Sequence, residues 1–342
     1  MPEKVTIATV ARHAQVSRQT VSNVLNSPHL VREETRERVR DAIATLGYRV
    51  SQAARQMRTG RSKLLAARIE PTRDGINGSV LDRFLHGLTE TAEAAGYRVL
   101  LYTAGDRAAE IAAYDDLLGA YDLDGFVLTG TDHGDVRTAW LAERGVPFVT
   151  FGRPWDSPER HPWVDVDGAA GAAQATRHLI GAGHRRIAFV GWPAGSGVGD
   201  DRRSGWLAAL READLPYADE LDRRTVDGIT EGAAVTRDLL ALAEPPTALV
   251  CASDSLAIGA LQAARTYPPN GRDLAVTGFD DTPVAQAIGL TSVSQPLGQA
   301  AARCIELLTA LLDGDVSGGP RAAGQPPSQV LLRPSLVIRQ PA

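Results

Sequence analysis

Three polar side chains near the N-terminus have the types and the spacing to read DNA bases. At about 100° per residue, Arg18, Gln19 and Asn23 share one face of a predicted helix, opposite the apolar Val21 and Val24. An arginine can fork onto guanine, and Gln or Asn amides can pair with adenine through two hydrogen bonds. This face therefore predicts base recognition, and a merely solvated helix face is the alternative.

Three short helices are predicted to position these side chains. The first covers about residues 7–14 behind an N-cap at Thr6, and the second covers about residues 18–25 behind an N-cap at Ser17. A third covers about residues 33–46, and each helix carries an apolar stripe. The tight turn at Gln15 and Val16 between the first two is typical of a helix-turn-helix.

The net charge of -5 hides two regions of opposite sign. Residues 1–63 contain 12 Lys+Arg and 5 Asp+Glu, a net charge of +7, and the remaining residues carry a net charge of -12. A polyanion such as DNA attracts the first region and is repelled by the second. The asymmetry favours a DNA-binding head attached to an acidic body.

From residue 64 onward, short apolar runs alternate with helical stretches. The runs cover residues 64–69, 97–102, 125–129, 147–151, 186–191, 248–252 and 274–279. This order predicts parallel sheets covered by helices on both faces. The length of the region favours two lobes, with a ligand bound in the crevice beyond the carboxyl ends of the strands.

The chain also resembles a known family. The segments TIATVARHAQVSRQTVSNVLN and VREETRERVRDAIATLGY are similar to the DNA-binding head of the LacI/GalR family of bacterial transcription regulators. The body continues the resemblance through VDVDGAAGAAQATRHLIGAGHRRIAFVG, TALVCASDSLAIGALQAA, LAVTGFDDTPVA and VLLRPSLVIRQ. The resemblance implies a small all-α helix-turn-helix head and an α/β body like that of periplasmic binding proteins, with two Rossmann-like lobes built on parallel sheets.

The resemblance also implies the domain boundaries. A DNA-binding domain is expected at 1–50, a hinge helix or linker at 51–62 and an effector-binding and dimerisation domain at 63–342. Within that domain the N-lobe is expected at about 63–163 and 293–324, and the C-lobe at about 164–292 and 325–342. The chain would then cross between lobes near 160–165, 288–295 and 318–327.

The resemblance assigns DNA contacts residue by residue. Arg18, Gln19 and Asn23 stand where the family reads bases in the major groove. Phosphate contacts are implied for Thr6, Thr20, Ser22, Asn26 and Arg32, the last of which replaces the usual capping Ser or Thr of the third helix. In the hinge, Ala53 and Ala54 are small enough for two such helices to approach closely, and Met57 stands where the family wedges a Leu into the minor groove.

Effector contacts are implied in the body. Arg202, Asp254, Gln295 and Arg153 match positions where relatives touch ligand, and planar charged groups suit vicinal hydroxyls. The alternatives are a helix cap for Asp254 and a salt bridge for Arg153. Asp280 and Asp281 are expected to organise a turn. Trp192, directly after a strand end, is the expected aromatic platform, and the alternative aromatics are Phe84, Trp155 and Trp163.

Two further motifs are interpreted as structural elements and not as nucleotide-binding or metal-binding sites. The segment GWPAGSGVGDD at 191–201 departs from a dinucleotide loop because Asp200 stands where the third glycine is needed, so an interlobe loop is expected. Asp165 and Asp167 are expected at a strand end and a helix N-cap rather than at a metal.

These features predict a cytoplasmic, ligand-responsive repressor of carbohydrate-utilisation genes. A homodimer would bind a pseudo-palindromic double-stranded operator, and a small sugar-like effector would control it, without a cofactor or a membrane. Cys251 and Cys304 lack metal-ligand spacing, and no catalytic constellation indicates an enzyme. The alternative is a periplasmic-type solute-binding protein with no role on DNA.

Overall fold

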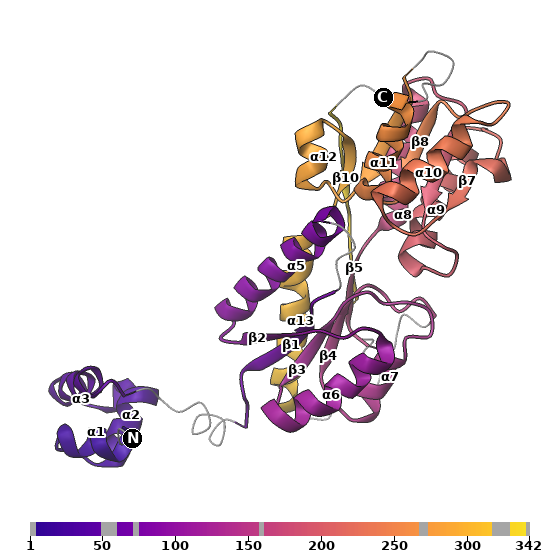
Figure 1. The fold of residues 1–342 in the computed structure, drawn as a ribbon. Helices are drawn as coiled ribbons and strands as arrows, with labels where there is room; N and C mark the ends of the chain where they lie inside the picture. The colour runs from indigo at the N-terminus through magenta and orange to yellow at the C-terminus, as the bar shows by residue number, and fades with distance from the viewer. Residues whose placement is uncertain are drawn as a thin grey trace. The chain divides into compact units, whose positions relative to one another are not determined.

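The computed structural model describes residues 5–48, 60–70, 75–156, 161–266, 273–316 and 329–339. Two compact units make up the chain, Met1–Ser62 and Lys63–Ala342. The first is a helical head and the second is an α/β body (Figure 1).

The head contains the three predicted helices, α1 (Ile7–His13), α2 (Arg18–Asn26) and α3 (Glu33–Leu46), with an unpredicted 3-10 turn, η1 (Pro28–Leu30), before α3. Both predicted N-caps are confirmed, because the side chain of Thr6 accepts a hydrogen bond from Thr9 N and that of Ser17 accepts one from Thr20 N. At the start of α3, Arg32 makes no side-chain capping bond.

Apolar residues from all three helices form the core of the head. The buried members are Val10, Ala11, Ala14, Val21, Val24, Val39 and Ala42. Between α1 and α2, Gln15 adopts a left-handed φ of 55°, a conformation that turns the chain within very few residues. The head therefore has a core of its own, and the polar face of α2 is left outside it.

The N-lobe of the body is a fully parallel sheet in the order β11-β5-β4-β3-β1-β2. Its strands are β1 (Leu64–Arg68), β2 (Arg98–Tyr102), β3 (Gly125–Leu128), β4 (Phe148–Phe151), β5 (Trp163–Val166) and β11 (Gln329–Leu332). Helices α5 (Gly75–Ala94) and α13 (Leu297–Val316) pack together on one face, and α6 (Arg107–Tyr121) and α7 (Val136–Glu143) on the other. Alternation along the strands supplies both faces, since Val127 joins the first cluster and Phe126 the second.

The C-lobe sheet has the order β12-β10-β9-β8-β6-β7. Its strands are β6 (Ile187–Gly191), β7 (Asp222–Arg224), β8 (Ala248–Cys251), β9 (Ala275–Phe279), β10 (Thr291–Ser294) and β12 (Ser335–Val337). Helix α8 (Gly168–Gly181) packs on α9 (Gly197–Glu212), and α10 (Ile229–Leu240) packs on α11 (Asp254–Thr266). A short helix, α12 (Pro283–Ile288), precedes β10.

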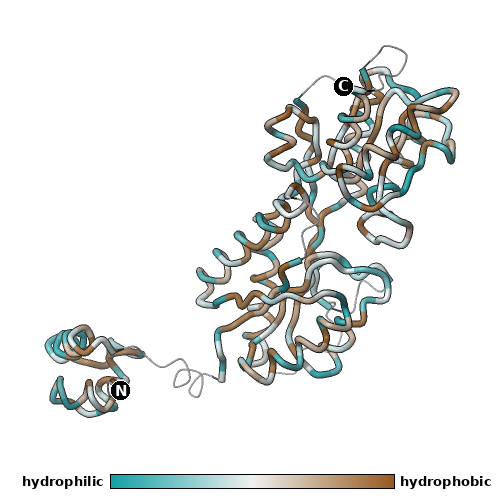
Figure 2. Tube along the Cα trace, viewed as in Figure 1, coloured by the Kyte–Doolittle hydropathy of each residue, from teal (hydrophilic) through white to brown (hydrophobic). Residues whose placement is uncertain are grey.

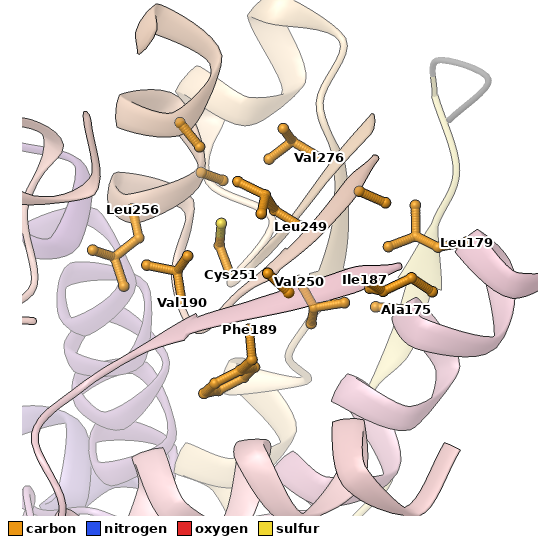
Figure 3. Packing of buried hydrophobic residues seen from close by; sticks show 14 of the residues in the cluster. Ala175, Leu179, Ile187, Phe189, Val190, Leu249, Val250, Cys251, Leu256 and Val276 are labelled. Atoms are coloured by element: carbon orange, nitrogen blue, oxygen red, sulfur yellow. The ribbon is translucent and has the colours of Figure 1, made fainter. Parts of the chain in front are cut away.

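The centre of the C-lobe is apolar on both sides of its strands. Figure 3 shows Phe189 on one side of the sheet and Leu249 and Val276 on the other, all of them buried. Figure 2 shows that the strands are mainly hydrophobic, whereas the helices combine hydrophobic and hydrophilic residues. The predicted two-lobed parallel α/β body is therefore confirmed, with one difference: β12 pairs with β10 in the antiparallel direction.

Two crossings between the lobes lie at or next to the predicted residues, and the third lies elsewhere. Strand β5 pairs with β4 and β11, so the first crossing is at Asp167, just after the expected 160–165. The second runs through Gln295 and Pro296, between β10 and α13. The third lies at Arg333 and Pro334 rather than in 318–327, because the closing apolar segment is divided between β11 in the N-lobe and β12 in the C-lobe.

The glycine-rich segment at 191–201 is only partly a loop. Ser196 caps a helix through Gly199 N, and α9 begins at Gly197, so the expectation of an interlobe loop across the whole segment was wrong. Asp167 does cap α8, as predicted, by accepting a hydrogen bond from Ala170 N.

Candidate DNA-binding face and effector site

The face of α2 presents the three side chains predicted to read bases. Arg18 and Gln19 are exposed and Asn23 is half-buried. The Gln19 amide nitrogen donates a hydrogen bond to Asn23 Oδ1 at 2.9 Å, one helical turn away. The two amides are thus held next to each other in the absence of DNA.

The residues predicted to contact phosphates lie at the ends and on the polar side of the helices. Thr6 is the N-cap of α1 and Arg32 the N-cap residue of α3, and both are exposed. Thr20 lies in the first turn of α2, with its hydroxyl 2.9 Å from Ser17 Oγ. At the other end of α2, Asn26 donates to the backbone oxygen of Ser22 at 2.7 Å. Helix starts carry backbone N–H groups without intrahelical acceptors, which suits them to phosphate.

The hinge residues Ala53, Ala54 and Met57 lie outside the described part of the chain. The assignment of Met57 as a minor-groove wedge therefore stays a prediction.

In the body, Arg202 of α9 occupies an aromatic cage in the C-lobe. Its guanidinium carbon lies 3.6 Å from the ring centroid of Phe279 and 5.0 Å from that of Trp192. The residue is 5% exposed, and one of its terminal nitrogens donates to the backbone oxygen of Ala252. Its Nε has no hydrogen-bond acceptor among the described residues. Burial lowers the pKa of Arg202, while the charge of Asp280 acts in the opposite direction.

Asp280 and Gln295 complete this group. The Gln295 amide nitrogen donates to Asp280 Oδ1 at 2.6 Å, and an Arg202 terminal nitrogen lies 3.6 Å from the same oxygen. Burial raises the pKa of Asp280 to about 8. Asp280 has a φ of 107°, and left-handed backbone at a residue other than glycine is concentrated at functional sites. Arg202 and Gln295 are thus brought together as predicted, but around Asp280.

Asp254, which was also predicted to contact the effector, is hydrogen-bonded within the turn after β9 and not to Arg202 or Gln295. It is fully buried, and its Oδ2 accepts hydrogen bonds from Thr282 N at 2.7 Å and from Thr282 Oγ1 at 2.8 Å. Its Oδ1 accepts from Ser292 Oγ at 2.6 Å, and Ser292 in turn accepts from Asp281 N at 3.0 Å. Burial raises the pKa of Asp254 to about 6. Asp254 thus holds the turn that carries Asp280.

Arg153 connects the two lobes. From the end of β4 its Nε donates to Asp165 Oδ2 of β5 at 2.5 Å, and a terminal nitrogen donates to Asp201 Oδ2 of α9 at 3.2 Å. Burial alone would lower the pKa of Arg153, but the bond to Asp165 and the surrounding carboxylates raise it. The salt bridge anticipated as an alternative is thus present, and it crosses from the N-lobe to the C-lobe.

Two of the candidate aromatic residues line this region and two do not. Trp192 is half-buried beside Arg202, as expected of a wall of the site. Trp155 follows β4 and lies against Gly197, where a Cβ atom would overlap its indole ring. Phe84 is fully buried and stacks on Phe151, and Trp163 is 6% exposed in β5, so neither offers a ring face to a ligand.

A second charged group, which the sequence reasoning missed, lies at the strand ends of the N-lobe. Arg137 is 1% exposed and its terminal nitrogen donates to both oxygens of Glu110, at 3.1 and 3.0 Å. Glu110 also accepts from Tyr114 at 2.8 Å and from Arg68 at 2.6 Å. A cavity of about 500 Å³ adjoins Arg68 and Arg137. The only sequence signal was charge inside apolar patterns, such as Arg68 in LLAARIE.

The described residues contain no cluster of His, Cys, Asp and Glu that could hold a metal ion. No helix among them is both long enough and apolar enough to cross a membrane.

Comparisons with known proteins agree with this geometry. Residues 6–51 match the family described as bacterial regulatory proteins, lacI family, and residues 176–341 match a periplasmic binding protein-like domain. The HTH-type transcriptional regulator CelR of Thermobifida fusca is 32% identical over 98% of this chain and 97% of its own length.

Two solved structures are similar over nearly the whole chain. A complex of transcriptional regulator CelR with cellobiose has a TM-score of 0.72 and 29% identity, over 99% of this chain and 100% of that one. A lac repressor dimer bound to operator and the anti-inducer ONPF has a TM-score of 0.82 and 25% identity, over 99% of both chains.

A helix-turn-helix head with an exposed polar recognition face, joined to a two-lobed binding body, defines a DNA-binding transcription regulator and not an enzyme. The chain belongs to the lacI family of bacterial regulatory proteins, which confirms the resemblance inferred from its sequence.

Proposed function

We propose that this protein is a cytoplasmic, dimeric repressor of carbohydrate-utilisation genes that binds operator DNA and responds to a sugar-like effector in its body. The part of the proposal that concerns the effector rests on one observation: the guanidinium of Arg202 lies against aromatic rings beside Asp280 and Gln295. Planar charged donors and acceptors next to aromatic rings suit the hydroxyls and the apolar ring faces of a sugar. The solved CelR structure in complex with cellobiose supports this proposal.

On the DNA side, the proposal assigns base reading to Arg18, Gln19 and Asn23. Because Gln19 and Asn23 are hydrogen-bonded to each other, less side-chain entropy remains to be lost when they dock against base edges. Phosphate contacts are assigned to Thr6, Thr20, Ser22, Asn26 and Arg32. Two heads in a homodimer would match the two half-sites of a pseudo-palindrome.

Within the effector site, the proposal keeps Arg202, Gln295 and Trp192 from the sequence prediction and adds Asp280 in place of Asp254. Arg153 closes the same region from the N-lobe through Asp201. A ligand that competes for either carboxylate changes the contact between the lobes, and this change is the proposed route to the head. Such coupling is typically worth about 1–3 kcal/mol.

The test of the effector site is Arg202→Ala, measured by fluorescence anisotropy on DNA from the gene's own promoter with and without cellobiose and a panel of other sugars. The wild type should bind operator more weakly in the presence of one of the sugars. Without sugar the variant should bind operator as tightly as the wild type, and its affinity should no longer fall when that sugar is added. Hydrogen bonds from a charged donor are worth about 1.5–3 kcal/mol, so at least tenfold more sugar should be needed. Arg303→Ala, in an exposed pair with Glu306, is the matched control. A variant that still responds at the wild-type sugar concentration removes Arg202 from the site.

The test of the DNA face is Gln19→Ala on a set of operators that differ at single half-site positions. Discrimination at one position should fall by about 1–3 kcal/mol, because the amide that pairs with a base is lost. Unchanged discrimination at every position would contradict the assignment. A chain with no salt-dependent DNA binding at all would instead favour the solute-binding alternative.

A further inference from the structure

The effector site contains more carboxylates than guanidinium groups. Arg153 and Arg202 are its cations. The carboxylates whose charges act on one or both of them are Asp165, Asp167, Asp201, Asp227 and Asp280. Asp281 is left out of this balance because Arg339 pairs with it. With all five carboxylates ionised, these groups and the two guanidinium groups give a formal charge of -3; near pH 7, where Asp280 with its pKa of about 8 is mostly protonated, the charge is about -2.

This excess of negative charge falls where solvent screening is weak. Asp280 is 6% exposed and Asp165 is 7% exposed. Burial raises the pKa of both Asp201 and Asp280, and neighbouring carboxylates add to the increase in each case. A further anion placed here would meet the same repulsion at low dielectric.

Two buried donors in the same site lack acceptors. The Nε atom of Arg202 and the indole nitrogen of Trp192 have no hydrogen-bond partner among the described residues, and the Arg202 side chain is only 6% exposed. A buried donor without an acceptor costs about 1–3 kcal/mol. Neutral oxygens of a ligand can accept from these donors without adding negative charge.

We propose that this site selects uncharged sugars and excludes sugar phosphates and uronic acids. Ring or hydroxyl oxygens of the ligand would accept hydrogen bonds from Arg202 Nε and the Trp192 indole nitrogen, and ligand hydroxyls would donate to the carboxylates. The proposal rests on the proposed effector site and adds the charge class of the ligand that it admits.

The charge of the site can be measured without knowing the effector. Trp192→Cys places a thiol at the site, and the two native cysteines are buried, at 1% exposure for Cys251 and 0% for Cys304. The full chain is treated with a cationic (trimethylammonioethyl) or an anionic (sulfonatoethyl) methanethiosulfonate, and both rates are divided by those for N-acetylcysteine amide. A local potential that raises the thiol pKa slows both reactions equally, so the ratio of the rates reports only the attraction of the reagent.

The cationic reagent should react at least about tenfold faster than the anionic one, as a potential of a few kT requires. Asp201→Asn together with Asp227→Asn should move the ratio toward one. Trp155→Cys, on the N-lobe side, is the second position to probe if Trp192→Cys does not fold. Equal rates, or a faster anionic reagent, would overturn the proposal.

A ligand panel provides the second readout. Glucose, cellobiose, glucose 6-phosphate and glucuronate are compared by operator release and thermal shift of the wild type. Release or stabilisation by the phosphate or the uronate overturns the charge selection while leaving a sugar-responsive regulator intact. If no sugar acts on operator binding, the proposed function fails, and the reagent ratio still decides the charge proposal.

Discussion

The two lobes of the body carry charged groups at the carboxyl ends of equivalent parallel sheets, but they compensate these charges differently. In the N-lobe, buried Arg137 is bonded to Glu110, to Asp135 and to two backbone oxygens. In the C-lobe, buried Arg202 has one backbone acceptor, a carboxylate 3.6 Å away and an Nε without an acceptor. Every guanidinium nitrogen of Arg137 is therefore bonded, although Nε of its neighbour Arg68 has no acceptor among the described residues, whereas Arg202 itself keeps an unused donor.

This contrast distinguishes charged groups that stabilise the fold from charged groups that remain available to bind a ligand. A buried ion pair with all its hydrogen bonds made has nothing to offer a ligand, and removing one partner strands the other. A guanidinium beside aromatic rings with an unused donor can gain a partner. Paired charges therefore indicate the framework of the N-lobe, and the incompletely paired Arg202 supports the proposed site of the C-lobe.

The largest expected effect concerns the buried ion pair of Arg137 and Glu110 in the N-lobe. Glu110→Gln removes the charge that Arg137 and Arg68 share, and it should lower the free energy of unfolding by about 3–5 kcal/mol in urea titrations. Glu306→Gln, whose partner Arg303 is exposed, should change it by less than about 1 kcal/mol. Equal losses in the two variants would break the contrast between the lobes.

The second effect is a difference in pH dependence. Because the folded pKa of Asp280, about 8, lies above its ordinary value of 3.8, its contribution to stability is complete below about pH 4 and is lost as the pH rises to 8. Asp254, raised to about 6, changes in the same direction but only up to that pH. Between pH 6 and 8, the free energy of unfolding of the wild type should therefore fall by up to about 1.4 kcal/mol per pH unit. The Asp280→Asn variant should lack this fall, and urea unfolding at each pH measures both proteins.

The N-lobe should show the opposite sign. Burial would raise the pKa of Asp135, but its bonds and charge interactions with Arg137 outweigh this and lower it. That contribution is present above the ordinary pKa and is lost as the pH falls below it. Hydrogen exchange should show the N-lobe loosening in acid and the C-lobe loosening toward pH 8. Loosening of both lobes in acid alone would contradict the assignment of Asp280.

The smallest expected effect concerns the contact between the lobes. Gly197→Ala places a methyl group where the Trp155 ring lies, so closure is hindered and the effector should bind about tenfold more weakly, a loss of about 1.4 kcal/mol. Gly181→Ala, in open space near the end of α8, is the control and should leave binding unchanged. Anisotropy on operator DNA, titrated with the active sugar, measures both variants.

The sequence predicted the elements with a regular apolar pattern. The three helices of the head and the seven apolar runs of the body all appear, since amphipathic periodicity and continuous burial are local properties. Strands β7 and β10, of three and four residues, were missed, and β5 was anticipated only through the strand end expected at Asp165. In the closing segment VLLRPSLVIRQ, pattern alone does not show that Pro334 divides the chain between two sheets.

The site was less predictable than the fold, because its contacts join distant residues. Arg153 and Asp201 are 48 positions apart and lie in different lobes, so no spacing signals their bond. Asp254 and Asp280 both follow a strand end, and only the hydrogen bonds of Thr282 and Ser292 show which carboxylate is already used. The position of Asp280 beyond the carboxyl end of β9 was the available signal.

The three crossings between the lobes set the mechanical freedom of the body. At Gln295–Pro296 and Arg333–Pro334 the chain passes through a proline, whose ring fixes φ and leaves fewer torsions to rotate. Asp167, at the remaining crossing, is held as the N-cap of α8. Relative movement of the lobes is thus confined to a few backbone bonds, and a ligand that touches Gln295 acts directly on one of them. A small torque applied there is converted into displacement that grows with distance from the crossings.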